Sequence, residues 1–212
     1  MIETAQGLVL RTRPLTDTSL IVHWLTPGFG RLATVAKGAR RAKSSYAGKL
    51  DLFYAADFSF QRSRSSDLHQ LREVVLREPH ARLRTDLRYV QQAAYAALLI
   101  EQTTERETPL PEIHDLFAGF LAYLPGQPPR ALSVFAWELR LLRELGLEPD
   151  GEAEGLGELR LAWLHRLLES DWAELAAAPP EDQHLLGLGA FLRGFLLHHL
   201  GKVPAARAAA LP

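Results

Sequence analysis

The hydrophobic pattern of this chain changes its period at Pro79, and this change limits the folds that the chain can adopt. Before Pro79, apolar and polar side chains alternate in five short runs, at residues 6–13, 18–26, 31–38, 52–62 and 68–78. Alternation with a period of two is typical of strands that bury one face. Beyond Pro79, apolar residues recur every three to four positions from Leu83 to Leu98, as on one face of a helix. The sequence therefore predicts a β part at residues 1–79 and an all-α part at residues 80–212.

The β part has the spacing of a small barrel. Five short strands with a long connection between the third and fourth match a five-stranded Greek-key barrel of the OB type. Leu8 and Leu10 are expected on one face of the first strand and Val9 on the other, and Phe58 shares a face with Phe60 on the fourth. Barrels of this type bind single strands across one face, between the loop joining strands one and two and the loop joining strands four and five. Here these loops are residues 15–18 and 63–67.

The α part divides at its prolines and glycines. Central helices are predicted within residues 80–146, at 82–102, up to Leu124, and at 130–146, where Gly146 is a suitable C-terminal glycine. An acidic, glycine-rich connector at 147–157 precedes C-terminal helices at 158–175 and 182–200. The tail, residues 201–212, is expected to fray.

A basic run lies in the long connection of the β part. Between Arg31 and Lys49 there are six cations and no acid, and glycine and serine residues lie among them. A row of cations gains free energy on a polyanion by displacing condensed counterions, and glycine allows close approach of the backbone to phosphate. An ordinary solvated loop is the alternative interpretation, since most short charge runs are no more than that. Arg62 flanks the loop at 63–67 and Arg64 lies within it, and both also suit phosphate contact.

Charge is distributed unevenly, although the net charge of the chain is only −1. Residues 1–80 hold 12 Lys and Arg against 7 Asp and Glu, whereas residues 81–212 hold 12 against 18. A basic half joined to an acidic half suggests a nucleic-acid-binding module coupled to a part with another task. We expect a cytoplasmic, nucleoid-associated protein, because no membrane-spanning segment or signal peptide is recognisable.

The sequence offers little for catalysis. It has no GxxxxGK[ST], GxGxxG or GxSxG motif, so nucleotide hydrolysis and a nucleophile elbow have no support. It has no cysteine, and its eight histidines include no HExxH pair, so we expect no metal and no cofactor. We expect a protein that is not an enzyme, with no bound nucleotide.

The chain from Gly7 to about residue 150 resembles the RecO family of bacterial recombination mediators. The likeness lies in GLVLRTR, IVHWLTPGFGRL and above all VAKGARRAKS, and continues in FAWELRLLRELGLEPD, so that it covers about residues 7–150. Many members of this family carry a four-cysteine zinc finger after the last element, whereas this chain continues LEPDGEAEGLGE without cysteine. It therefore resembles a member that lacks the finger.

The resemblance implies an OB domain that binds single- and double-stranded DNA and anneals complementary strands. It also implies that the protein acts with RecR and the single-stranded-DNA-binding protein SSB to load RecA on gapped DNA. The DNA-contacting family positions correspond to Lys37, Arg40, Arg41 and Lys43. With the residues beside them, the predicted DNA-binding set is Arg31, Lys37, Arg40, Arg41, Lys43, Tyr46, Lys49, Arg62 and Arg64.

The helical half could receive the C-terminal tail of SSB, a short acidic segment that ends in an apolar residue. Such a tail needs an apolar groove rimmed by arginine. The candidate residues are Phe135, Leu139, Arg140, Leu142 and Arg143. Plain core packing, with the arginines facing solvent, is the competing interpretation of the same pattern.

Two readings of the basic run remain at this stage. In the first, the chain is a DNA-binding and annealing mediator, with Trp24, Phe29 or Tyr46 as aromatics that could stack on bases. Trp24 and Phe29 are equally suited to the core, so Tyr46 is the best candidate of the three. In the second, the chain is a protein-interaction adaptor whose basic loop docks an acidic partner protein.

Overall fold

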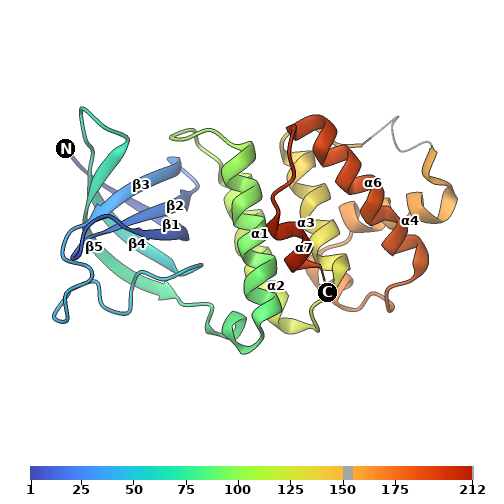
Figure 1. Ribbon diagram of the computed structural model, residues 1–212, viewed down its shortest axis with the longest axis horizontal. Helices are drawn as coiled ribbons and strands as arrows, with labels where there is room; N and C mark the ends of the chain where they lie inside the picture. The colour runs from blue at the N-terminus through green and yellow to red at the C-terminus, as the bar shows by residue number, and fades with distance from the viewer. Residues whose placement is uncertain (150–154, 212) are drawn as a thin grey trace. The chain divides into compact units, whose positions relative to one another are not determined.

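The structure, a computed structural model, describes residues 1–149 and 155–211 (Figure 1). Two compact units make up the chain. The barrel unit comprises Met1–Ala81 and Thr104–Ala118, and the helical unit comprises Arg82–Thr103 and Gly119–Pro212. Part of the predicted connector, residues 150–154, lies outside the described residues.

In the described residues, five strands form the barrel unit's sheet, as predicted. They are β1 (Ile2–Pro14), β2 (Leu20–Thr26), β3 (Gly30–Ala36), β4 (Ala55–Gln61) and β5 (Leu68–Glu78). The sheet closes on itself in the order β1-β2-β3-β5-β4, and only the short β3–β5 pairing is parallel. Closure pairs strands that would otherwise be edges, and this OB-type arrangement leaves residues 37–54 as a long excursion between β3 and β4.

The barrel core is built on aromatic stacking. Trp24 lies against Phe58 with ring centroids 4.1 Å apart, and its indole nitrogen donates to the hydroxyl of Thr34 at 2.9 Å. Phe58 and Phe60 both belong to this core, as their shared parity predicted. On β1, Val9 belongs to this core whereas Leu8 and Leu10 do not, as their alternation predicted, but all three are buried, so β1 buries both of its faces here. The β1–β2 register also shifts between Val9 and Arg11, as at a β-bulge.

A segment that follows helix α1 in the chain belongs to the barrel unit. In this returning segment, residues 104–110, the backbone N–H of Glu107 donates to Arg31 O at 2.9 Å, and that of Leu110 donates to Pro27 O at 3.0 Å. Gly30, with φ of +61°, lies so close to the segment that a Cβ built there would overlap the carbonyl of Thr108. Only glycine fits at this position.

Beyond β5, the described residues form α-helices and short 3₁₀ turns. They are η1 (Ala81–Thr85), α1 (Leu87–Thr103), α2 (Pro111–Tyr123), η2 (Leu124–Gly126), α3 (Ala131–Glu144), α4 (Glu158–Glu169), α5 (Trp172–Ala176), α6 (Gln183–Leu200) and α7 (Ala206–Ala210). The unit boundaries fall within η1 and α2. Gly146 ends α3 with φ of +69°, as the sequence predicts for a C-terminal glycine.

Three helix predictions need correction. The helix expected at 82–102 begins only at Leu87, where Asp86 accepts a hydrogen bond from the backbone N–H of Arg88 at 2.8 Å. The helix expected at 158–175 is two helices, because Asp171 forms a capping box with Glu174 and starts α5. The tail does not fray as a whole, since it forms α7 at the C-terminal end (Figure 1). Within residues 1–149 and 155–211, no helix is long and apolar enough to cross a membrane.

Candidate nucleic-acid interface

The basic loop, residues 37–49, is a succession of tight turns. Backbone N–H groups donate to the carbonyl three residues earlier at Ala39, Arg41, Ser44, Ala47 and Lys49, with distances of 3.0 to 3.3 Å. Gly38 and Gly48 have positive φ values of +73° and +71°. The turns therefore hold the loop's cations in defined places without a regular helix or strand.

Tyr46 anchors this loop to the barrel. Its ring is half-buried against the barrel core, and its hydroxyl lies 3.1 Å from Leu71 O and 3.0 Å from Arg72 O on β5. Burial raises the pKa of Tyr46, so the hydroxyl keeps its proton for these carbonyls. The sequence singled Tyr46 out for base stacking, whereas the structure gives it a structural contact.

Arg40 ties the basic loop to the loop between β1 and β2. Its backbone N–H donates to Thr18 O at 3.0 Å, and its guanidinium donates to Thr16 O at 2.9 Å. The basic loop and the loop at 15–18 therefore lie side by side.

Most cations of the basic loop face solvent. Lys37, Arg40, Arg41 and Lys43 are exposed, and Lys49 is half-buried. Within the described part of the chain, no carboxylate forms an ion pair with Lys37, Arg41, Lys43 or Lys49. Their charge is therefore available to an anion from outside.

The remaining predicted cations differ from these. Arg31 donates to the carbonyl of Thr104 in the returning segment. Arg62 is paired with Glu3 at 2.9 Å and with Glu107. The hydrogen bond from Arg62 lowers the pKa of Glu3, so this carboxylate stays charged and holds the arginine. Arg62 is thus mostly compensated, whereas Arg64 is exposed in the loop at 63–67.

A hollow of about 370 Å³ lies between the two loops that the barrel type predicts. It is lined by Leu15, Val35, Lys37, Gln61, Arg62, Ser63, Leu68, His69 and Gln70. His69 is fixed in it, with its ring stacked on Phe60 and its Nδ1 accepting from the backbone N–H of Ser63 at 3.3 Å. Lys37 lines this hollow, which makes the hollow a candidate place for a phosphate.

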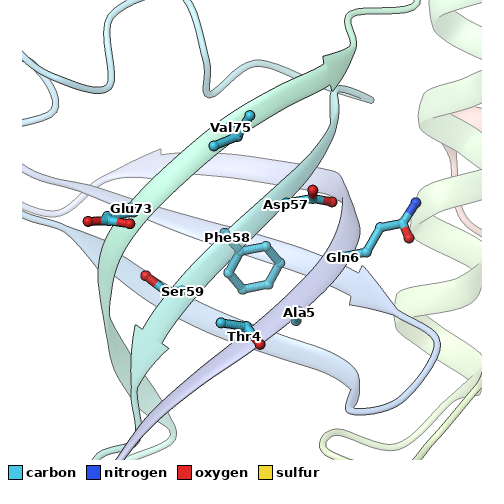
Figure 2. A pocket seen from close by; sticks show the side chains of 8 residues that line it. All are labelled: Thr4, Ala5, Gln6, Asp57, Phe58, Ser59, Glu73 and Val75. Carbon is cyan, nitrogen blue, oxygen red and sulfur yellow. The ribbon is translucent and has the colours of Figure 1, made fainter.

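A larger hollow of about 470 Å³ lies on β1, β4 and β5 (Figure 2). Figure 2 shows the carboxylates of Asp57 and Glu73 around it, with the ring of Phe58 between them. Arg77 pairs with Asp57, but Glu73 is exposed. Carboxylates repel phosphates, so the hollow beside Lys37 is the better candidate for a polyanion.

The other aromatics proposed for stacking on bases are occupied in the barrel. Trp24 is fully buried under Phe58, which removes it from that role. Phe29 is half-buried, meets the ring of Phe60 edge-on at 5.6 Å and has the Arg62 guanidinium 5.8 Å from its ring centre.

Comparison with known proteins matches both parts of the chain to one family. Residues 1–80 match the family described as "Recombination protein O N terminal", and residues 84–160 match "Recombination protein O C terminal". The chain belongs to the RecO family. The family resemblance carried by VAKGARRAKS and FAWELRLLRELGLEPD is thereby confirmed.

Relatives named "DNA repair protein RecO" match over different shares of their length. The protein from Exiguobacterium sibiricum is 35% identical over 150 residues, which are 70% of this chain and 59% of that protein. The one from Anaeromyxobacter dehalogenans is 29% identical over 235 residues, covering 95% of this chain and 92% of that protein. A relative from Rhodopirellula baltica is 30% identical over 143 residues, covering 68% of this chain and 53% of its own length.

The groove predicted for an SSB tail is not an open groove in this RecO-family chain. Phe135, Leu139 and Leu142 are each at most 2% exposed, because they form the buried side of α3. They are core residues, which was the competing interpretation.

Arg140 is buried beside them and does not face solvent. Its Nε donates to Leu167 O at 2.9 Å, it also donates to Ser170 O, and its guanidinium lies 4.1 Å from the Trp172 ring centre. Burial lowers its pKa to about 10. Arg143 donates to Leu168 O at 3.1 Å and lies 3.5 Å from a Glu169 oxygen. Both arginines therefore bind carbonyls at the C-terminal end of α4, and they do not form the rim that an acidic tail would need.

Proposed function

We propose that this chain is a DNA-binding recombination mediator in DNA repair. In this proposal it binds single- and double-stranded DNA through the basic loop, anneals complementary strands, and helps RecR to displace SSB so that RecA can load. The observation that carries the proposal is the set of exposed cations Lys37, Arg41 and Lys43, held by turns beside a hollow on the barrel.

The physical basis of binding is counterion release. Each phosphate that a lysine or arginine neutralises frees part of the condensed ion atmosphere, and this gain does not depend on base sequence. The turns and the Tyr46 anchor limit the conformations of the loop before DNA arrives, so less entropy is lost on binding. Binding that is independent of sequence suits a protein that acts on any gapped DNA.

Family membership supports the repair role, because the relatives carry the name DNA repair protein RecO. The chain lacks the common nucleotide-binding loops, so annealing is proposed to need no ATP.

The experiment measures the salt dependence of DNA binding. A triple variant, Lys37→Ala, Arg41→Ala and Lys43→Ala, leaves Arg40 and Tyr46 in place so that the loop keeps its attachments. Fluorescence anisotropy with a labelled single strand over a range of KCl concentrations should give a log–log slope smaller by about 2, from about 0.7 for each lost phosphate contact. Arg77→Ala, which removes an exposed arginine beside the acidic hollow, is the control and should leave the slope unchanged.

An unchanged slope in the triple variant would reject the loop as the DNA contact. Annealing is tested with complementary oligonucleotides precoated with the cognate SSB, with and without RecR and without nucleotide. Wild type should accelerate annealing and the triple variant should not. Absence of any DNA shift at low salt, together with retained binding of an acidic protein, would favour the adaptor function.

A further inference from the structure

One edge of strand β5 is paired along only part of its length. Strand β3 pairs with it at residues 68–70, whereas β4 accompanies its other edge to the end of the strand. The hydroxyl of Tyr46 lies at hydrogen-bond distance from the next two carbonyls, and Pro79, which has no N–H to donate, follows the strand. In the described part of the chain, residues 73–77 therefore have β4 as their only strand partner. We name residues 73–77 the free edge of β5.

An edge of this kind can accept a further strand, because its outward N–H and C=O groups lack partners from the sheet. Proteins usually protect such an edge with charged side chains. The free edge has the sequence EVVLR, with one charge of each sign at its two ends. The order of these charges decides which strand can pair there.

The two charges and the central valine lie on the outer face of the barrel. Val74 belongs to the barrel core, so its neighbours Glu73 and Val75 point outward. Both line the larger hollow, and Figure 2 shows them on β5. Arg77 pairs on the same face with Asp57, the cross-strand partner of Val75. Val75 is 55% exposed, so an apolar side chain lies uncovered at the centre of the free edge.

The free edge is complementary to a second copy of itself. In an antiparallel pair centred on Val75, the two valines meet, and Glu73 of each copy lies opposite Arg77 of the other. Opposite charges directly across a ladder are stabilising, and so is contact between β-branched side chains. A shift by two residues in either direction places a charged side chain opposite Val75 and removes both ion pairs. The sequence of the edge therefore selects one register.

Both charged side chains can make this contact. Glu73 is exposed and forms no ion pair within residues 1–149 and 155–211. Arg77 donates to Asp57 from Nε and Nη2, so its remaining N–H groups are left for a second carboxylate. The side chain of Arg77 is 60% exposed, which lets a partner reach it.

We propose that the free edge of β5 pairs antiparallel with the same edge of a second copy of this chain and so forms a two-fold symmetric dimer. The occupant is a second copy because, in a two-fold contact, each group that one copy offers is the partner that the other needs. The free edge spans about 17 Å at about 3.4 Å per residue, which is short for a stable interface. The dimer is therefore expected to be weak and to depend on protein concentration and salt.

Sedimentation velocity of the full chain without nucleic acid tests this pairing, so the result does not depend on the proposed function. Wild type should change from monomer to dimer as its concentration rises through the micromolar range at low salt. Glu73→Arg and Arg77→Glu each place like charges opposite one another, and each should weaken dimerisation by about tenfold or more. An equimolar mixture of these two variants should recover the dimer, because each charge then meets its opposite.

Two further variants complete the set. Val75→Lys brings two ammonium groups together at the two-fold axis and should also keep the chain monomeric, which provides a test if Arg77→Glu does not fold. Arg88→Glu reverses an exposed arginine of α1 and should dimerise as wild type does, which separates edge pairing from an effect of net charge. Thermal unfolding shows which variants are folded.

Hydrogen exchange locates the contact. Amides of the free edge that point away from β4 should exchange more slowly at high protein concentration in wild type, and not in Glu73→Arg. The proposal is overturned if wild type stays monomeric, if folded Glu73→Arg and Val75→Lys dimerise as wild type does, or if the mixture of folded charge variants remains monomeric. A dimer without slower exchange at residues 73–77 also overturns it, because the contact then lies elsewhere.

Discussion

Arg207 and Glu138 form a bidentate ion pair inside the helical unit. Nε of Arg207 lies 2.6 Å from Oε1 of Glu138, and Nη2 lies 2.9 Å from Oε2. Tyr95 donates its hydroxyl to the same carboxylate at 2.6 Å, and burial raises the pKa of Tyr95. Glu138 has no solvent exposure, so its charge depends on these partners. Helix α7 therefore supplies a cation that the core requires.

Removing this cation should destabilise the helical unit. Arg207→Ala leaves a buried carboxylate without its counterion, which typically costs about 3 to 5 kcal/mol. Urea unfolding followed by far-UV circular dichroism measures the loss. Arg193→Ala removes an exposed arginine from α6 and should change the free energy of unfolding by less than about 0.5 kcal/mol. Equal stability of Arg207→Ala and Arg193→Ala would contradict a structural role for α7.

Local sequence pattern predicted the elements whose partners are nearby, and it missed those whose partners are distant. The alternation of Phe58 and Phe60 and the glycine that ends α3 follow from local rules, and both are observed. The alanine-rich tail has no apolar periodicity, and its helix depends on a carboxylate 69 residues away. The returning segment likewise depends on contacts with β3 that no local pattern encodes.

The candidate interface shows the same division. Residue types alone identified Lys37, Arg41 and Lys43 as exposed cations, because cations in a glycine-rich turn region without acids remain solvated. Residue types could not show that Tyr46 and Arg62 differ from these exposed cations. Tyr46 is held by a contact with β5, and Arg62 is held by Glu3 and Glu107, all of them distant in the sequence. Nor could residue types distinguish Arg140, which enters the core because carbonyls at the end of α4 accept its hydrogen bonds.

Gly30→Ala should destabilise the barrel unit by about 2 kcal/mol or more. The new methyl group would overlap the Thr108 carbonyl, and alanine at φ of +61° is strained in addition. Gly28→Ala is the matched control two residues earlier, because a Cβ there meets nothing within 4 Å. Thermal unfolding of the two variants compares them directly. If Gly30→Ala melts together with Gly28→Ala, the returning segment does not lie against β3 as described.

Charge reversal at Arg140 and at Arg143 should give unequal results. Arg140→Glu places a carboxylate in a buried site among carbonyls, and we expect a loss of about 3 kcal/mol or more in the free energy of unfolding. Arg143→Glu affects a pair that solvent reaches, and the loss should stay near 1 kcal/mol. Denaturant titration of both variants gives the comparison. Equal, small losses would contradict the burial of Arg140. A groove for an acidic tail on α3 would then have to be considered again.

His23 should make the barrel less stable as the pH falls from about 6.5 toward about 4. Its pKa is about 4 in the folded chain, against about 6.5 in the unfolded chain, so the unfolded chain takes up the proton first. The associated stability is fully present above pH 6.5 and is lost as the pH approaches the folded pKa. Its size is at most about 3 kcal/mol. Burial is the largest cause of the lowered pKa, and salt reduces only the part that comes from the charges of Arg11, Arg13, Arg106 and Arg31.

His23→Gln removes this titration, so the difference in unfolding free energy between wild type and variant should change between about pH 7.5 and about pH 5. His165→Gln, at an exposed histidine of the helical unit, is the control for the loss of a histidine and is measured over the same pH range. A pH-independent difference for His23→Gln would mean that burial and the nearby arginines do not lower the pKa of His23 in the folded chain.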